Sequence, residues 1–224
     1  MKINYIGHAG FFITADSAGI LIDPFISGNP LAIANFDKNL VKDILITHGH
    51  FDHLGDSIEI AKESNATITA VFELASYCAR MGAKATGMNI GGKIQLQDAT
   101  AKVYPAFHSS ADNEGTYLGC PCSFIMEVGG KTIYHAGDNC LNQELKTIGE
   151  LHKVDIALLP IGGHFTMGID DAIIAAKWLN ADTIIPMHYD TFPPIKTNPS
   201  EFESKVAAAG KKCTIIKPGE TIEI

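Results

Sequence analysis

Short apolar runs alternate with polar interruptions along the whole chain, and their lengths indicate the elements of the fold. In the first quarter, runs of about four or five apolar residues are separated by Gly, Asp, Ser and Pro, a pattern typical of strands joined by turns. The predicted strands here cover residues 2–6, 11–14, 20–23 and 44–47. This part of the chain is therefore expected to form a meander of strands.

From residue 56 onward, helical and strand patterns alternate. Two mixed sheets, each with helices on its outer face, would bury both apolar sheet faces against each other. The pattern therefore predicts an α/β protein, a four-layer α/β/β/α sandwich. Its predicted helices cover residues 56–63, 73–81, 143–151, 170–179 and 201–209, and its further strands cover 67–71, 93–96, 101–107, 123–128, 132–135, 156–160, 183–186, 213–216 and 221–224.

Length and composition fit one globular unit. The chain has 224 residues, of which 46% are hydrophobic and 19% are charged, and it contains no low-complexity segment or linker. A chain of this length can bury a substantial core. We expect a single domain that spans residues 1–224.

The net charge and the first residues of the chain limit the classes of partner that we expect. The formal net charge of −8 disfavours a nucleic-acid backbone as the main ligand, because phosphate binding needs a basic patch. The first residues lack the pattern of a signal peptide, and no apolar run approaches the ~20 residues that a membrane-spanning helix needs. We therefore expect a cytoplasmic protein that binds neither nucleic acid nor membrane and could form a homo-oligomer.

Cysteine usage agrees with a reducing compartment. The five cysteines form an odd set without a disulfide framework. Cys120 and Cys122 flank Pro121 and could form a soft metal site, but a structural zinc normally needs four ligands and no second pair lies nearby. We interpret them as ordinary thiols at the start of a strand. The five are Cys78, Cys120, Cys122, Cys140 and Cys213.

A cluster of histidines and an aspartate follows the apolar run at residues 44–46. Imidazole nitrogens and carboxylate oxygens suit Zn²⁺, Fe, Ni and Mn. His48 and His50 are two residues apart, so on an extended segment they point the same way and can bind one ion. Asp52 and His53 are adjacent and diverge, which suits a second ion. The segment Thr47–His53 therefore predicts a metal site.

Further metal-binding residue types lie where other predicted strands end. His108, Asp138 and His188 each come directly after such a strand or within three residues of its end. Loops at strand ends can converge on one site while the scaffold stays rigid. We expect these three side chains to complete the site.

Five motifs in order resemble those of the metallo-β-lactamase fold superfamily, over essentially the whole chain. They are Ile20–Asp23, Thr47–His53, His108, Gly137-Asp138 and His188. Three further segments resemble a bacterial and archaeal group of metal-dependent hydrolases related to L-ascorbate-6-phosphate lactonase. These are residues 6–9, 162–167 and 187–189.

The resemblance implies a two-metal site. His48, His50 and His108 would hold the first ion, and Asp52, His53 and His188 the second, with Asp138 as the bridge. Asp23 would not be a ligand but would hydrogen-bond and orient the histidine loop. The expected cofactors are two divalent metal ions; zinc is the first choice, and manganese, iron and nickel are alternatives.

The expected chemistry is hydrolysis by a hydroxide that bridges the two ions, which in such sites lie ~3.5–4 Å apart. The catalytic candidates are Asp52 and His164. His164 follows two glycines and would stabilise an oxyanion or donate a proton; alternatively, it caps a tight loop. His8 would reach the site from the first strand turn, or would only anchor that turn.

The substrate stays open at this point. The main hypothesis is a small-molecule substrate, a small lactone or phosphoester. The alternatives are a phosphodiesterase that acts on nucleotides or lipid head groups, and a metal-binding protein without catalysis. Segments 26–37 and 109–119 are the expected substrate loops, and Tyr189, Thr191 and Phe192 are expected to line the pocket.

Overall fold

The computed structural model describes residues 1–15 and 17–224. One mixed sheet of seven strands has the order β14-β1-β2-β3-β4-β5-β6. Its pairs are antiparallel from β14 to β3 and parallel from β3 to β6. The strands are β1 (Lys2–Gly7), β2 (Gly10–Ala15), β3 (Ala18–Ile22), β4 (Val41–Leu45), β5 (Thr67–Val71), β6 (Ala85–Met88) and β14 (Thr221–Glu223).

The second sheet also has seven strands, in the order β13-β12-β11-β10-β9-β8-β7. Its pairs are antiparallel from β7 to β10 and parallel from β10 to β13. The strands are β7 (Lys93–Gln95), β8 (Ala99–Pro105), β9 (Cys122–Val128), β10 (Lys131–His135), β11 (Ile156–Pro160), β12 (Thr183–Met187) and β13 (Lys212–Cys213).

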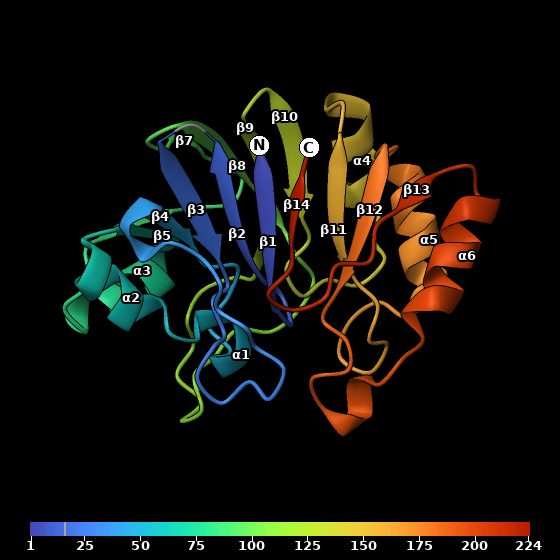
Figure 1. Ribbon diagram of the computed structural model, residues 1–224. Helices are drawn as coiled ribbons and strands as arrows, with labels where there is room; N and C mark the ends of the chain where they lie inside the picture. Colours follow the sequence, from blue (N-terminus) through green and yellow to red (C-terminus); the bar gives the residue numbers. More distant parts are fainter. Residues whose placement is uncertain (16) are drawn as a thin grey trace.

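Helices cover the outer side of each sheet (Figure 1). α2 (Ser57–Ser64) and α3 (Phe72–Arg80) pack on the first sheet, and α4 (Glu144–Leu151), α5 (Ile169–Trp178) and α6 (Pro199–Ala208) lie beside the second. This arrangement confirms the predicted α/β/β/α sandwich. Among the described residues, no helix combines the length and apolarity needed to cross a membrane.

The core lies between the two sheets and beneath the helices. Every residue of β3 and of β11 is buried, as expected for strands covered on both faces, which read as continuous apolar runs. The largest side chains that are fully buried include Phe11, Phe124 and Tyr134. This packing holds the strands rigidly, so the loops at their ends start from fixed positions.

Three elements differ from the sequence prediction. Neither the single-turn helix α1 (Phe51–Leu54), which lies inside the histidine cluster, nor the strand β6 was among the predicted elements. β6 is half-exposed at the sheet edge and contains Gly87, so it carries no apolar pattern. β13 has only two residues instead of the four predicted at 213–216. Two short 3₁₀ helices, η1 (Lys38–Leu40) and η2 (Pro193–Ile195), occupy connections.

Candidate metal centre

The predicted ligands lie at strand ends along one edge of the sandwich, the lower edge in Figure 1. Strands from both sheets contribute. His48 and His50 follow β4 in the first sheet, whereas His108, Asp138 and His188 follow β8, β10 and β12 in the second. The two sheets therefore supply opposite walls of one site.

Several residues at this edge adopt left-handed backbone conformations. The φ angles are 58° at His8, 42° at Asp23 and 55° at His188. Residues other than glycine rarely adopt this region, and the strain persists only where surrounding structure imposes it. Each of these residues comes directly after its strand, so the left-handed turn redirects the chain at the site.

One group of possible ligands consists of His48, His50 and His108. Each of the three offers one nitrogen, and these atoms lie within 4.8 Å of one another; Nε2 of His48 is 2.9 Å from Nδ1 of His50. Burial lowers the pKa of all three imidazoles. Neutral imidazoles keep the lone pairs that a metal ion requires.

A second group brings Asp52, His53 and His188 together with His8, again with one atom each within 4.8 Å of the others. Asp52 and His53 lie on the helix α1, whose tight turn places adjacent side chains at one site. The prediction grouped the first three of these residues. His8 was expected either to reach the site or only to anchor the first strand turn, and its position in this group agrees with the first alternative.

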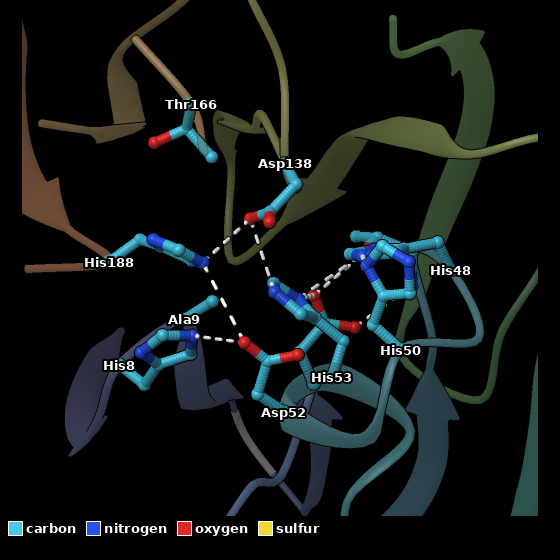
Figure 2. Close-up of polar contacts among 12 residues, drawn as sticks. His8, Ala9, His48, His50, Asp52, His53, Asp138, Thr166 and His188 are labelled. Carbon is cyan, nitrogen blue, oxygen red and sulfur yellow. Dashed lines mark hydrogen bonds and ion pairs between the residues drawn. The ribbon is translucent and has the colours of Figure 1, made fainter. Parts of the chain in front are cut away.

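Asp138 lies between the two groups (Figure 2). Its Oδ1 is 3.1 Å from Nε2 of His53 and 3.1 Å from Nε2 of His188. Its Oδ2 is 3.3 Å from Nε2 of His108. Burial opposes ionisation of Asp138, but His188 and His53 outweigh it and hold the pKa well below its usual range.

The donor atoms at the centre of the site lack hydrogen-bond partners. Among the described residues, Nε2 of His53, Oδ1 of Asp138 and Nε2 of His188 are buried and none makes a hydrogen bond. An unsatisfied buried polar atom costs about 1–3 kcal/mol. Divalent metal ions would satisfy all three atoms, and imidazole and carboxylate are suitable ligands. The residues present therefore fit the implied ions.

Asp23 holds the histidine loop from behind. Its Oδ1 accepts a hydrogen bond from the backbone N–H of Thr47 at 2.8 Å, and its Oδ2 accepts from the Thr47 hydroxyl at 2.6 Å. The same Oδ2 lies 2.8 Å from Nδ1 of His53. This contact holds a proton on Nδ1 and directs Nε2 toward Asp138. Burial opposes protonation of His53, but Asp138 and Asp23 outweigh it and raise its pKa well above the ordinary value, so a metal ion at Nε2 would displace a proton. The geometry matches the orienting role expected for such carboxylates.

Gly137 allows the close approach of Asp138. Its φ is 58°, and a Cβ there would lie 2.8 Å from the carbonyl oxygen of Cys122 and 2.9 Å from the Cβ of Thr47. Only glycine fits this position.

The thiol of Cys122 donates to the carbonyl of Thr47 at 3.2 Å, and burial raises its pKa well above the ordinary value. Cys122 thus acts as a packed thiol at the start of β9.

His8 connects both sides of the site. Its Nε2 is 3.1 Å from Oδ2 of Asp52, and its Nδ1 is 2.9 Å from the hydroxyl of Thr191. Its carbonyl oxygen accepts hydrogen bonds from the Tyr5 hydroxyl at 2.9 Å and from the His188 N–H at 2.7 Å. Burial lowers the pKa of His8 to about 4. His8 is therefore a neutral side chain that contacts Asp52.

A cleft of about 640 Å³ opens onto these residues. The segment after β8 contributes Ser109, Ala111, Asp112 and Asn113, as predicted for the loop 109–119. The segment 26–37 contributes no residue to the lining of this cleft, and its role as a substrate loop stays a prediction. Of the three pocket residues predicted after His188, only Phe192 lines the cleft.

His164 does not reach the cleft. Its side chain is exposed, and its ring packs edge-on against Phe165, with the centroids 4.5 Å apart. Phe165 is the residue of this loop that lines the cleft. The loop turns back through a hydrogen bond from Gly163 N–H to the Met167 carbonyl, which directs His164 outward. The predicted contact of His164 with substrate is therefore absent from this geometry.

Comparison with known proteins places the chain in a family. A family model described as the beta-lactamase superfamily domain matches residues 2–188. Two relatives described as UPF0173 metal-dependent hydrolases are 47% identical in Pelotomaculum thermopropionicum and 46% identical in Geobacillus thermodenitrificans, with 100% of each chain covered. The chain therefore belongs to the beta-lactamase superfamily and, within it, to the UPF0173 metal-dependent hydrolases.

Solved structures agree. The structure of Igni18, described as a novel metallo hydrolase from the archaeon Ignicoccus hospitalis, is 40% identical, with a TM-score of 0.90 over 100% of this chain and 98% of that one. An isothiocyanate hydrolase from Delia radicum gut bacteria is 21% identical, with a TM-score of 0.78, and shares the fold. These findings confirm the predicted superfamily and the predicted enzyme class. The relation to L-ascorbate-6-phosphate lactonase stays a prediction.

Proposed function

We propose that this protein is a dinuclear metal-dependent hydrolase of small molecules. His48, His50 and His108 would hold one divalent ion, Asp52, His53 and His188 the other, and Asp138 would contact both. The observation that carries the proposal is the position of Asp138, whose two carboxylate oxygens face His53 and His188 on one side and His108 on the other. Zinc is the preferred ion, with manganese, iron and nickel as alternatives.

Such ions, when bound, supply an activated water as the nucleophile and polarise the oxygen of the scissile group. The protein's own residues would position the substrate and exchange protons with it. Asp52 contacts His8 through Oδ2; its carboxylate would hold the second ion and would accept a proton during hydrolysis. No side-chain nucleophile is required.

Further features support a small-molecule substrate. The cleft volume lies within the range of about 300–1,000 Å³ that is typical of small-molecule sites. The net charge of −8 gives no support for nucleic-acid binding. All five cysteines are free thiols, which agrees with the proposed cytoplasmic location. We also propose that the protein can form a homo-oligomer.

The substrate proposed is a small lactone or phosphoester. The alternatives are a phosphodiesterase acting on nucleotides or lipid head groups and a metal-binding protein without catalysis. Both would use the same ligands, so the experiment has to separate metal binding from bond cleavage.

Elemental analysis of the purified protein, together with substrate screening, tests this proposal. We expect two metal equivalents per chain after reconstitution with Zn²⁺ or Mn²⁺, and hydrolysis of a lactone in both forms. Asp138→Asn should lower the metal content below two. A protein that binds no metal after reconstitution contradicts the proposal. Hydrolysis of bis-p-nitrophenyl phosphate alone would favour the phosphodiesterase, and two bound ions without hydrolysis would favour the binding protein.

A further inference from the structure

Aromatic side chains form much of the cleft wall. Phe51, Phe165 and Phe192 line the cleft beside His188 and Asp52. Phe51 and Phe165 are about half exposed, with 51% and 54% of their surface accessible. Large apolar side chains that stay exposed in a concave site mark a surface that a ligand covers.

Part of this wall is held by a buried ring behind it. Phe25 is 3% exposed; its ring centroid lies 5.6 Å from that of Phe51 and 6.2 Å from that of Phe192. The centroid of Phe192 lies 5.6 Å from that of His8, which contacts Asp52. The apolar wall therefore begins next to the proposed metal ligands, and its preorganised rings lose little freedom when a ligand binds.

The charge of the lining differs from that of a phosphate site. Among the residues that the structure describes, no lysine or arginine lines the cleft, and its charged side chains are Asp52, Asp112 and Asp138. Arginine and lysine are the side chains that recognise phosphate through paired or point-charge contacts. A cleft without them offers a phosphorylated substrate only the ions themselves.

One arginine lies close by, in an adjoining hollow of about 480 Å³. Arg80 lines this hollow, which shares Phe51, Asp112 and Asn113 with the cleft and also contains Glu114. The two carboxylates there oppose the binding of an anionic group. Arg80 is therefore the cationic side chain that an anionic substrate would contact. Its replacement serves as a control for the charge of the substrate.

We propose that the substrate of this site is an uncharged carboxylic ester or lactone that carries an aromatic or similarly large apolar group beside its carbonyl; this rests on the proposed hydrolase function. Water adds to the carbonyl carbon, the carbon–oxygen single bond breaks, and the leaving oxygen takes a proton. An ester gives a carboxylic acid and an alcohol, whereas a lactone gives a single hydroxy acid, and no oxidant or reductant is consumed. The apolar group packs against Phe51, Phe165 and Phe192.

A series of hydroxamates tests the proposal by binding, without relying on turnover. Acetohydroxamate, phenylacetohydroxamate and its para-phosphonate derivative share one chelating group and differ in the apolar and charged parts. Titration calorimetry of the zinc-loaded protein should show phenylacetohydroxamate binding on the order of tenfold more tightly than acetohydroxamate, as expected for contacts of one ring with aromatic side chains. The para-phosphonate derivative should bind no more tightly than acetohydroxamate.

Variants assign the effect to the wall. Phe165→Ala and Phe192→Ala should each weaken the binding of phenylacetohydroxamate by a larger factor than the binding of acetohydroxamate. Phe72→Ala removes a ring of similar exposure, 63%, outside the cleft, and should change neither affinity; Arg80→Ala should also change neither. Because Phe165 is exposed, its replacement tests the proposal even if Phe192→Ala fails to fold.

The outcomes separate this inference from the proposed function. Equal affinities for acetohydroxamate and phenylacetohydroxamate overturn the apolar subsite. Tightest binding of the phosphonate, lost in Arg80→Ala, overturns the uncharged substrate in favour of an anionic one. In both cases the hydrolase proposal stands if two ions bind and a lactone is cleaved. Absence of bound metal would instead contradict the hydrolase proposal itself.

Discussion

Oδ2 of Asp23 lies 2.8 Å from Nδ1 of His53, and neither side chain is accessible to solvent. The hydrogen bond fixes the imidazole tautomer, so the remaining nitrogen faces the centre of the site. Asp23, which lies outside the proposed ligand set, thereby orients a proposed metal ligand.

Replacement of Asp23 by Asn should weaken metal binding about 10–100-fold, as is typical for partners of metal-bound histidines. The amide would also place a donor against Thr47, which should lower the free energy of unfolding by about 1–3 kcal/mol. Chelator competition measures the affinity, and urea unfolding measures the stability. Asp56→Asn is the matched control, because Asp56 accepts backbone hydrogen bonds from Ile26 and Ser27 and contacts no histidine. Unchanged metal affinity in Asp23→Asn would contradict the orienting role.

His8 is expected to support the second ion rather than the first, since its Nε2 contacts Asp52. His8→Asn tolerates the left-handed backbone but is too short to reach that carboxylate. We expect one ion to be retained and the affinity for the other to fall about 10–100-fold. Thr191→Val removes only the hydroxyl that contacts Nδ1 of His8. It should weaken the affinity for the second ion by about 1 kcal/mol, or roughly fivefold. Metal titration followed by elemental analysis distinguishes the two variants. Two ions bound to His8→Asn with unaltered affinity would show that His8 only anchors its turn.

His164→Asn should leave metal content unchanged and alter lactone hydrolysis by less than about twofold. The reason is its exposed position outside the cleft, where substitutions have small effects. Steady-state kinetics over a range of pH measures this directly. A large fall in kcat with intact metal content would instead restore the acid or oxyanion role predicted from the sequence and would imply that the loop moves during turnover.

His135 should make the stability of the metal-free protein depend on pH. Its Nε2 donates to the Ala9 carbonyl at 2.9 Å, and its Nδ1 accepts from the Gly137 N–H at 3.1 Å, so the folded state holds it neutral. Burial lowers its pKa from the ordinary 6.5. Above pH 6.5 its contribution is complete; as the pH falls from 6.5 through the folded pKa, the unfolded chain binds the proton first and stability is lost.

This dependence is at most about 1.4 kcal/mol per pH unit for one group. Urea unfolding of the metal-free protein at pH 7.5 and 5.5 measures it, with His135→Gln as the variant that cannot titrate. Between pH 7.5 and 5.5, we expect the free energy of unfolding to fall more in the native sequence than in the variant. Identical losses in both would assign the pH dependence to other groups.

Strand patterns and the four-layer architecture could be predicted from the sequence because apolar periodicity directly reports which faces are buried. The helix α1 could not be, because one turn inside a polar cluster has no periodicity to read. Its absence from the prediction matters little for His48 and His50, whose facing nitrogens were inferred from an extended segment. For Asp52 and His53 the predicted grouping at one ion agrees with the structure, but the helical turn that brings them together was not predicted.

The positions of His8 and His164 show where sequence reasoning ends. The sequence favoured His164 over His8 as a residue of the site, but of the two only His8 has a left-handed backbone and buried contacts from Tyr5 and Thr191. Those contacts join residues far apart in the chain, so no local pattern reveals them. The single-domain organisation of residues 1–224 likewise stays a prediction.

The most direct test of the two-metal site is anomalous diffraction from crystals of the zinc-loaded protein. We predict two peaks about 3.5–4 Å apart, one beside His48, His50 and His108 and the other beside Asp52, His53 and His188, with Asp138 between them. A single peak, or peaks away from Asp138, would contradict the account.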